Sequence, residues 1–436
     1  MNFGDRQFDF IRPSFTRISN GLKVVTVPMP GRESVSVAIW VRAGSRYETK
    51  GISGVSHFLE HMLFKGTKRR STRQIKQEIE GVGGILNAFT SEECTCYFAK
   101  LLKGHLSRAL DVLADMVNHA TLDAAEFKKE KPVILEEIKM YCDLPAQYVH
   151  ELMGELLWPD QPLGRPIAGT LETAGGINRS EMEAYRNRFY HPRNLVVSVA
   201  GDINHREVVR QCEEHFQITR KKPAARYAAP SIRQRKPETC FVEKPTEQTH
   251  FVIGLRGYSR VHPDRYKLAL MNVLLGANMS SRLFDEVREK RGLAYEIKSG
   301  LNFFEDAGSL SISAGVETKK AATAVRIILR ELEKLRLKKI GEGELRRAKE
   351  YFMSQLAMTL EDTLEHLLWI CEAAVYRDQL PDRETVKRQI ERVTAEDLQH
   401  LAQDLFKNRN LNLSLLGPVE ASLQKKIQGQ FEIHES

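Results

Sequence analysis

The sequence predicts an α+β protein made of two similar halves. At 436 residues the chain is too long for one ordinary hydrophobic core, so about two or three domains are expected. Strand-like and helix-like segments follow in the same order before and after a basic, proline-containing stretch at residues 220–245. Residues 122–140 and 340–358 also share one pattern at an offset of 218 residues, which indicates an internal repeat.

The composition excludes several classes of protein. Hydrophobic residues make up 42% of the chain and charged residues 28%, as in an ordinary globular protein. The net charge of +8 comes without any nucleic-acid-binding signature, so we expect no nucleic-acid partner. The first residues lack the apolar segment of a signal peptide, and no run reaches the roughly 18 apolar residues of a membrane span. We therefore expect a cytoplasmic protein with no membrane partner.

The first half begins with two predicted strands, at residues 22–29 and 34–44. Both are rich in β-branched residues, and the turn sequence "PGRE" separates them. Glycines at positions 51 and 54 then interrupt the strand pattern, which favours a helix after them. The elements expected in order from there are a helix at 54–65, a helix at 72–80, paired strands within 85–102, helices at 106–120 and 123–141, and a strand at 194–200.

A linker is predicted at residues 220–245, whose first part has no helical or strand periodicity. It separates two predicted domains, residues 1–219 and residues 246–436. The elements expected after the linker are a strand at 249–259, helices at 264–275 and 282–290, strands within 294–315, and helices at 319–337 and 342–359.

The repeat does not carry the polar groups of the first half into the second. At the offset of 218 residues, Leu275 stands opposite His57 and Gln355 stands opposite Glu137. The second domain therefore repeats the scaffold pattern without the histidine and acidic groups. Any chemistry that needs those groups is expected in the first domain.

Two histidines and a glutamate occupy one turn of the helix predicted at 54–65. His57 and His61 are four residues apart, so their rings lie on one helix face and suit two nitrogen ligands of a zinc ion. Glu60 lies near the same face, where it could contact a water on the metal without being a ligand. The alternative is a pair of core histidines, because a motif this short arises by chance in roughly a few per cent of chains of this length. H-x-x-E-H is the inverzincin signature.

A catalytic zinc site normally has a third protein ligand. Glu126, Glu130 and Glu137 recur at spacings that place them on one face of the helix predicted at 123–141. Such a row of carboxylates either faces a cation or forms a solvated acidic stripe. Taken alone, the solvated stripe is the better interpretation.

The segment "GVSHFLEHMLFKGTKRRS", together with residues 130–138, resembles the M16 family of zinc peptidases, and most of all its processing-peptidase type. The resemblance covers nearly the whole chain. It implies an M16/LuxS-like metallopeptidase fold of two homologous halves, each an antiparallel-rich sheet covered by helices. The family pattern has a glutamate seventy-six positions beyond the second histidine, which is Glu137, as the third zinc ligand. A second family glutamate falls on Glu130 and is expected to support the metal site.

A strand in the first half is similar to the family's substrate-binding strand. "LNAFTSEECTCYFAK" matches its Asn-Ala-x-Thr pattern, so the resemblance implies that Asn87, Ala88 and Phe89 contact the substrate backbone. An extended peptide can add itself to an open strand edge through main-chain hydrogen bonds. Cys94 and Cys96 depart from the family's strand. They are not a zinc knuckle, because the chain has no second cysteine pair, and packing residues are a better interpretation than ligands. The departure from the family leaves their role open.

In the second half, "SSRLFDEVREKRGLAYEI" is similar to the family's Arg-x₆-Tyr element, here Arg288 and Tyr295. Without the resemblance, these are an arginine at a helix end and a tyrosine at a strand start. In the family they reach the scissile carbonyl and stabilise its developing negative charge.

The resemblance implies a zinc-dependent endopeptidase with one Zn²⁺ per chain, acting on peptides or unfolded segments in an enclosed chamber. Zinc lowers the pKa of its bound water to about 7, and Glu60 would take the proton of that water. Two chains would pair around the substrate, so we expect a homodimer, with a heterodimer also open. In it, Arg288 and Tyr295 would complete the partner's site. The alternative is a non-catalytic structural or partner subunit of a heterodimer.

Overall fold

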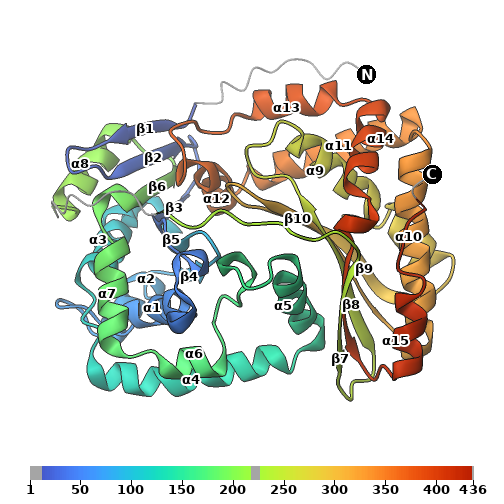
Figure 1. Ribbon diagram of the computed structural model, residues 1–436. Helices are drawn as coiled ribbons and strands as arrows, with labels where there is room; N and C mark the ends of the chain where they lie inside the picture. The colour runs from blue at the N-terminus through green and yellow to red at the C-terminus, as the bar shows by residue number, and fades with distance from the viewer. Residues whose placement is uncertain (1–11, 218–225, 435–436) are drawn as a thin grey trace. The chain divides into compact units, whose positions relative to one another are not determined.

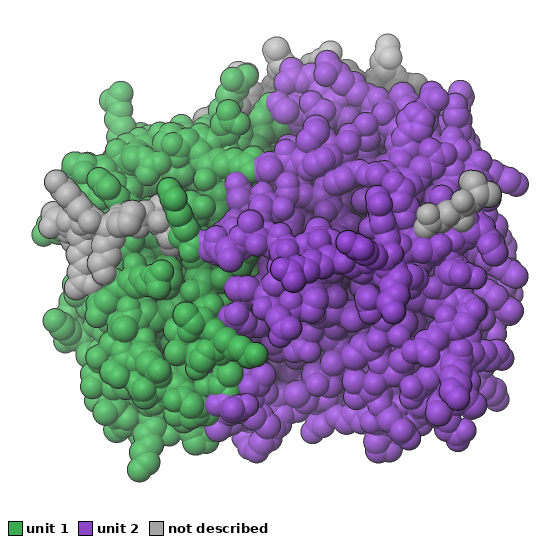
Figure 2. Space-filling model, viewed as in Figure 1, with its two compact units in different colours: residues 1–133, 173–226, 357–382 green, residues 134–172, 227–356, 383–436 purple. Residues whose placement is uncertain are grey.

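The structure, a computed structural model, describes residues 12–217 and 226–434. The chain forms two compact units, each built on its own β-sheet (Figures 1 and 2). The first unit comprises residues 1–133, 173–226 and 357–382, and the second comprises residues 134–172, 227–356 and 383–436. The predicted α+β class is confirmed. Across the described ranges, no helix is both long and apolar enough to cross a membrane.

The first unit contains a six-stranded sheet in the order β1-β2-β6-β3-β5-β4. Neighbouring strands are antiparallel, except that β2 and β6 run parallel. Nearly every residue of β2, β3 and β6 is buried, so both faces of the sheet centre are covered. Strand β4 lies at one edge. The strands are β1 (Ser14–Arg17), β2 (Lys23–Pro28), β3 (Ser34–Val41), β4 (Ile85–Thr90), β5 (Thr95–Leu102) and β6 (Leu195–Gly201).

The helices that begin in this half match the predicted ones where a prediction was made. Helix α2 covers Thr72–Glu80, as predicted, and Ser71 and Gln74 form a capping box at its start. Helix α4 is one continuous helix that extends from the first unit into the second. The helices are α1 (Val55–Leu63), α2, α3 (Leu106–His119), α4 (Ala124–Cys142), α6 (Leu171–Gly176), α7 (Arg179–Phe189) and α8 (His205–His215).

The second unit contains a five-stranded sheet in the order β7-β11-β8-β10-β9, again with one parallel pair, β7 and β11. The helix predicted at 282–290 is a π-helix at Phe284–Glu289. The strands are β7 (Glu238–Glu243), β8 (Thr249–Gly257), β9 (Ala294–Phe303), β10 (Gly308–Val316) and β11 (Asn412–Gly417). The other helices are α9 (Arg265–Leu275), α10 (Ala321–Leu337), α11 (Glu342–Thr359), α13 (Arg383–Arg392), α14 (Ala395–Leu405) and α15 (Ala421–Gln428).

Two helices are exchanged between the halves of the chain. Helix α5 (Pro145–Leu157) follows α4 in sequence but packs on β8 and β11 of the second sheet. Helix α12 (Thr363–Ala374) follows α11 but packs on β3 and β6 of the first sheet. Helices α4 and α5 begin 218 residues before α11 and α12, so the exchange is reciprocal within the internal repeat. Each sheet is thus covered in part by a helix from the other half.

The segment predicted as a linker, residues 220–245, lies only partly in a coil. Residues 220–225 are outside the described part of the chain, and residues 226–237 contain no helix or strand. Its last residues form strand β7, where Thr239, Phe241 and Val242 supply the β-branched and aromatic side chains typical of strands.

Candidate metal centre

Helix α1 carries the histidine motif, and a buried carboxylate fixes the start of this helix. The amides of Gly54 and Ser56 each donate a 2.7 Å hydrogen bond to the carboxylate of Glu48, which is 4% exposed. A negative charge at a helix N-terminus satisfies free amides and interacts favourably with the helix dipole. Gly54 itself has a φ of 98°, a conformation that favours glycine. The backbone is therefore fixed within one turn of His57.

The histidines and Glu60 lie as the helical spacing predicts. The ring centroids of His57 and His61 are 4.7 Å apart. Glu60 is buried, and its Oε2 accepts a 2.5 Å hydrogen bond from the Thr90 hydroxyl of the neighbouring edge strand β4. This bond holds the carboxylate of Glu60 beside the strand that is predicted to bind substrate.

Glu130, which the resemblance predicts to support the metal site, contacts His61. The Nδ1 atom of His61 lies 3.0 Å from Oε1 of Glu130, and Nζ of Lys65 lies 2.5 Å from Oε2. Burial alone would raise the pKa of Glu130, but the hydrogen bonds from His61 and Lys65 and the charge of Lys65 lower it overall. If the Nδ1 atom of His61 carries the proton of this contact, Nε2 of the same ring is the nitrogen left to face a metal ion.

Helix α4 brings Glu137 to the two histidines. Glu137 follows Glu130 by seven residues, or two helical turns, and so returns to nearly the same face. One ligand atom each from His57, His61 and Glu137 lie within 4.8 Å of one another. Among the residues that the structure describes, this is the one group of three or more histidine, cysteine, aspartate or glutamate side chains so placed.

This group suits a zinc ion. Two imidazole nitrogens and one carboxylate oxygen form a ligand set of catalytic zinc sites, which keep a fourth position open. Ligand atoms of a tetrahedral zinc lie about 3.4 Å apart, so small side-chain shifts suffice. Burial, and then the charge of His61, lower the pKa of His57 to about 4. His57 is therefore neutral at pH 7, which is the form that binds metal.

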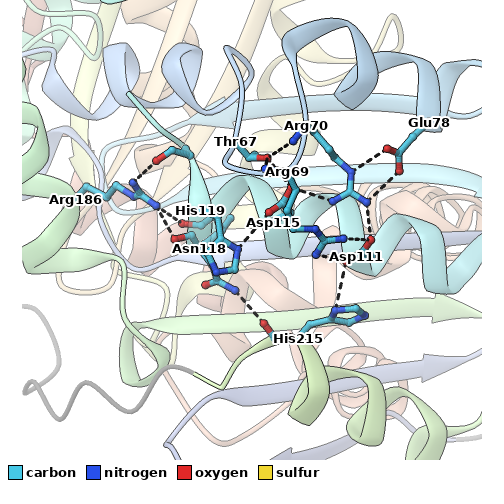
Figure 3. Close-up of polar contacts among 12 residues, drawn as sticks. Thr67, Arg69, Arg70, Glu78, Asp111, Asp115, Asn118, His119, Arg186 and His215 are labelled. Atoms are coloured by element: carbon cyan, nitrogen blue, oxygen red, sulfur yellow. Dashed lines mark hydrogen bonds and ion pairs between the residues drawn. The ribbon is translucent and has the colours of Figure 1, made fainter. Parts of the chain in front are cut away.

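A polar network stabilises the loop that follows α1 (Figure 3). The side chains of Thr67 and Arg70 donate to Oδ2 of Asp115 on α3, at 2.6 and 2.9 Å. Asp115 is 1% exposed; its bond with Thr67 is buried, and its bond with Arg70 is partly buried. Arg70 also binds Glu78 on α2 and Asp111 on α3. The network therefore fixes the chain between α1 and α2 against α3.

The predicted substrate-binding residues lie on β4, whose outer edge has no neighbouring strand in the described sheet. The amide of Ala88 donates a 2.8 Å hydrogen bond to Oδ1 of Asn87. The ring of Phe89 packs against Trp40 at a centroid distance of 5.7 Å, within an apolar cluster of the first unit. The Phe89 ring is partly buried by this packing. The contacts of these residues with a substrate stay a prediction.

Arg288 and Tyr295 lie together in the second unit. The guanidinium of Arg288 lies 4.9 Å from the Tyr295 ring and 4.7 Å from the Phe284 ring. Tyr295 is 79% exposed. Arg288 belongs to the π-helix, an element that occurs often at functional sites. The predicted role of this pair toward substrate stays a prediction.

Two further residues of this region, Glu48 and Lys65, could not be singled out from the sequence. Glu48 contacts the start of α1 and Lys65 contacts Glu130, and no local sequence pattern indicates either contact.

Cys94 and Cys96 are buried in the apolar cluster beside Trp40, which supports their interpretation as packing residues.

Family models match most of the chain. The model described as insulinase (peptidase family M16) matches residues 23–171, and the model described as the peptidase M16 inactive domain matches residues 176–352. An uncharacterised zinc protease of Bacillus subtilis is 37% identical over 400 residues, which cover 92% of this chain and 97% of that protein. An uncharacterised zinc protease of Streptomyces coelicolor is 34% identical over 411 residues, covering 93% and 89%.

Solved structures share the fold. A protease from Helicobacter pylori has a TM-score of 0.88 and 25% identity, covering 93% of this chain and 99% of that chain. A peptidase M16 inactive domain from Pseudomonas fluorescens has a TM-score of 0.87 and 21% identity, covering 94% and 99%, and shows a likeness of fold alone. Together with the curated relatives, the two family models establish that the chain belongs to peptidase family M16.

Proposed function

We propose that this chain is a zinc-dependent endopeptidase with one Zn²⁺ held by His57, His61 and Glu137. The observation that carries the proposal is the meeting of these three side chains within 4.8 Å, beside a buried glutamate that is not one of them. The names of the relatives, which are zinc proteases, support the same metal. When bound, zinc lowers the pKa of a water to about 7 and polarises the carbonyl to be attacked.

Glu60 is the proposed general base. Its carboxylate takes the proton of the attacking water and later delivers it to the leaving amine. The Thr90 hydroxyl donates to one carboxylate oxygen at 2.5 Å and so holds the group in place beside β4. Glu130 keeps the His61 ring in the tautomer and orientation that binding requires.

The proposed substrate is a peptide or an unfolded segment in extended conformation. It adds to the open edge of β4 through main-chain hydrogen bonds, because the last strand of a sheet has unpaired amide and carbonyl groups. A folded protein does not present a free extended segment to this edge. We therefore propose that the substrate is bound in an enclosed chamber, which admits peptides and unfolded segments and excludes folded proteins.

A homodimer is the proposed assembly, in which Arg288 and Tyr295 act on the substrate of the partner chain. Their guanidinium and hydroxyl groups would stabilise the charge that develops on the scissile carbonyl. The molecular mass in solution tests this assembly, with a mass near twice 49.8 kDa expected. A monomer at working concentration contradicts the homodimer, and activity that appears only with a second protein favours a heterodimer.

The rival function is that of a non-catalytic subunit. It is favoured by the match of residues 176–352 to a model described as an inactive domain. From residue 246 onward that match lies in the repeat that lacks the histidines, whereas residues 23–171 contain the whole group of proposed ligands.

The deciding experiment compares the native protein with Glu60→Gln and a control, Glu80→Gln, in which an exposed glutamate of α2 is changed. We expect about one zinc per chain in all three proteins. Cleavage of an unstructured peptide library should fall at least about a hundredfold in Glu60→Gln only. Zinc without cleavage in the native homodimer would favour the non-catalytic role. Full cleavage by Glu60→Gln contradicts the assignment of the base.

A further inference from the structure

A pocket of about 230 Å³ lies at one end of the six-stranded sheet, where α12 ends. Its lining contains five cationic side chains and one carboxylate, that of Asp378. We call it the cationic pocket. The cations are Arg17, Lys23, Arg42, Arg193 and Arg377.

The strand register explains why cations far apart in sequence meet there. Arg17 ends β1 and pairs with Lys23, which begins β2. The first residues of β6, which follow Arg193, pair with Lys23 and with the last residues of β3, which precede Arg42. Four strand ends thus converge. Arg377 is added by the chain that leaves α12.

The cations in the pocket are only partly compensated. Nζ of Lys23 lies 2.8 Å from Oδ1 of Asp378 and donates to the carbonyls of Ala374 and Arg377. Arg17 shares the same carboxylate at 2.9 Å. Across residues 12–217 and 226–434, the guanidinium of Arg193 makes no hydrogen bond or ion pair. Asp378, the one carboxylate of the lining, therefore binds Lys23 and Arg17, and Arg193 is the cation of the pocket whose guanidinium has no polar contact within the described residues.

Lys23 is buried at 6% exposure, and burial lowers its pKa overall. The ion pair with Asp378 opposes this lowering, and the nearby charges of Arg17 and Arg42 add smaller lowering effects. Like charges that converge in a partly buried site repel one another, and an entering anion would relieve this repulsion.

The second sheet has a pocket at the equivalent position, but the charges that line it differ. A larger pocket, of about 790 Å³, lies at the start of β7 and the end of α5, the repeat counterparts of β2 and α12. Glu238 begins β7 where Lys23 begins β2. Three carboxylates line this pocket with only two arginines. The duplicated scaffold therefore tolerates the opposite charge balance at this position.

We propose that the cationic pocket binds a small oxyanion of the phosphate class. Guanidinium groups match the oxygens of such an anion with paired hydrogen bonds. The volume is below the roughly 300–1,000 Å³ of pockets that enclose drug-sized ligands, so a single phosphate group fits and a nucleotide does not. Nothing in the proposed peptidase mechanism uses this pocket.

The test is calorimetric titration of the full-length, zinc-loaded protein with inorganic phosphate at constant ionic strength. Sulfate, chloride and glycerol phosphate are the comparison ligands. The variant is Arg193→Gln, because the guanidinium of Arg193 makes no hydrogen bond or ion pair with any residue that the structure describes. The matched control is Arg73→Gln, which changes an exposed arginine of α2 in the same unit.

We expect phosphate to bind more tightly than chloride, and at least about tenfold more weakly in Arg193→Gln, because a charge-assisted hydrogen bond is lost. Arg73→Gln should bind as the native protein does. If both variants bind phosphate equally, the proposal is overturned, because any binding then occurs elsewhere, for example at the metal centre. The proposal is also overturned if the native protein binds phosphate no more tightly than chloride. Tighter binding of glycerol phosphate than of phosphate would identify a monoester as the ligand.

Discussion

Phe58 of helix α1 stacks on Phe127 of helix α4, with ring centroids 4.7 Å apart and ring planes at 15°. Phe58 is fully buried and adjoins His57 in sequence. One turn further along α4, Glu130 binds His61. Two contacts on neighbouring turns therefore fix α4 against α1, and the continuous helix then positions Glu137. The distance between the histidines and the third proposed ligand is set by helical geometry rather than by a flexible loop.

The first prediction concerns Glu137. Because its carboxylate supplies the only negative charge among the three proposed ligands, Glu137→Gln should weaken zinc binding at least about a hundredfold. Metal analysis after dialysis measures this loss. The control is Glu136→Gln, which changes the adjacent glutamate; its side chain is 71% exposed and pairs with Lys139 at the surface. Equal zinc content in the two variants would show that Glu137 is not a ligand.

The second prediction concerns the pH at which zinc is lost. Glu130 has a pKa lowered by His61 and Lys65, against the effect of burial, so its ionised form persists below its unfolded pKa. The stabilisation is lost only as the pH falls through the lowered value. Lys65→Met removes one cause of the lowering. Glu130 should then take up its proton at a higher pH and release His61 there.

Zinc content measured against pH tests this expectation. The curve of Lys65→Met should lie at higher pH than the native curve, with no change at pH 8. Lys68→Met, which changes an exposed lysine three residues away, is the control. Superimposed curves for all three proteins would contradict a role of Lys65 in the metal site.

Part of this centre could be predicted from sequence because it is local. The spacing of His57, Glu60 and His61 on one helix face requires only the period of the helix. Glu137 had no local signal that separates a ligand from a solvated acidic stripe, and only the resemblance to a family singled it out. Contacts such as that of Thr90 with Glu60 depend on how β4 lies beside α1, which no local pattern specifies.

The third prediction concerns the network in Figure 3. Asp115→Asn leaves Arg70 with a weaker partner in a buried site, where the arginine side chain is 8% exposed. Breaking a buried ion pair costs about 3–5 kcal/mol, so the unfolding midpoint in denaturant should fall clearly. The control, Glu78→Gln, removes the partly exposed partner of the same arginine and should cost about 1 kcal/mol or less. Similar midpoints for both variants would contradict a structural role of the buried bond.

The fold shows the same division between local and tertiary information. The start of α2 follows from Ser71 and Gln74, which cap it, and these are readable in the sequence. The exchange of α5 and α12 is not readable, because an amphipathic helix has the same pattern whichever sheet it covers. Their apolar residues, Leu152 and Leu367 among them, predict burial but not the partner.

The fourth prediction concerns Glu48 as a positioning residue for α1. In Glu48→Gln the amide group presents a donor where the carboxylate accepted from a backbone amide, so one of the two bonds to Gly54 and Ser56 is lost. A hydrogen bond to a charged group contributes about 1.5–3 kcal/mol. The start of α1 should then move more freely, and with it His57.

Steady-state kinetics separate this positioning role from a general loss of stability. We expect kcat to fall about tenfold or more and zinc affinity to fall with it, while KM is unchanged, because β4 does not depend on Glu48 for its hydrogen bonds. Glu33→Gln, at an exposed position before β3, is the control and should leave all three quantities unchanged. If the variant unfolds more readily but retains the native kcat and zinc affinity, Glu48 only caps the helix and does not position His57. A fall in kcat that tracks zinc occupancy at every metal concentration would show that Glu48 acts on catalysis through the geometry of the histidine pair.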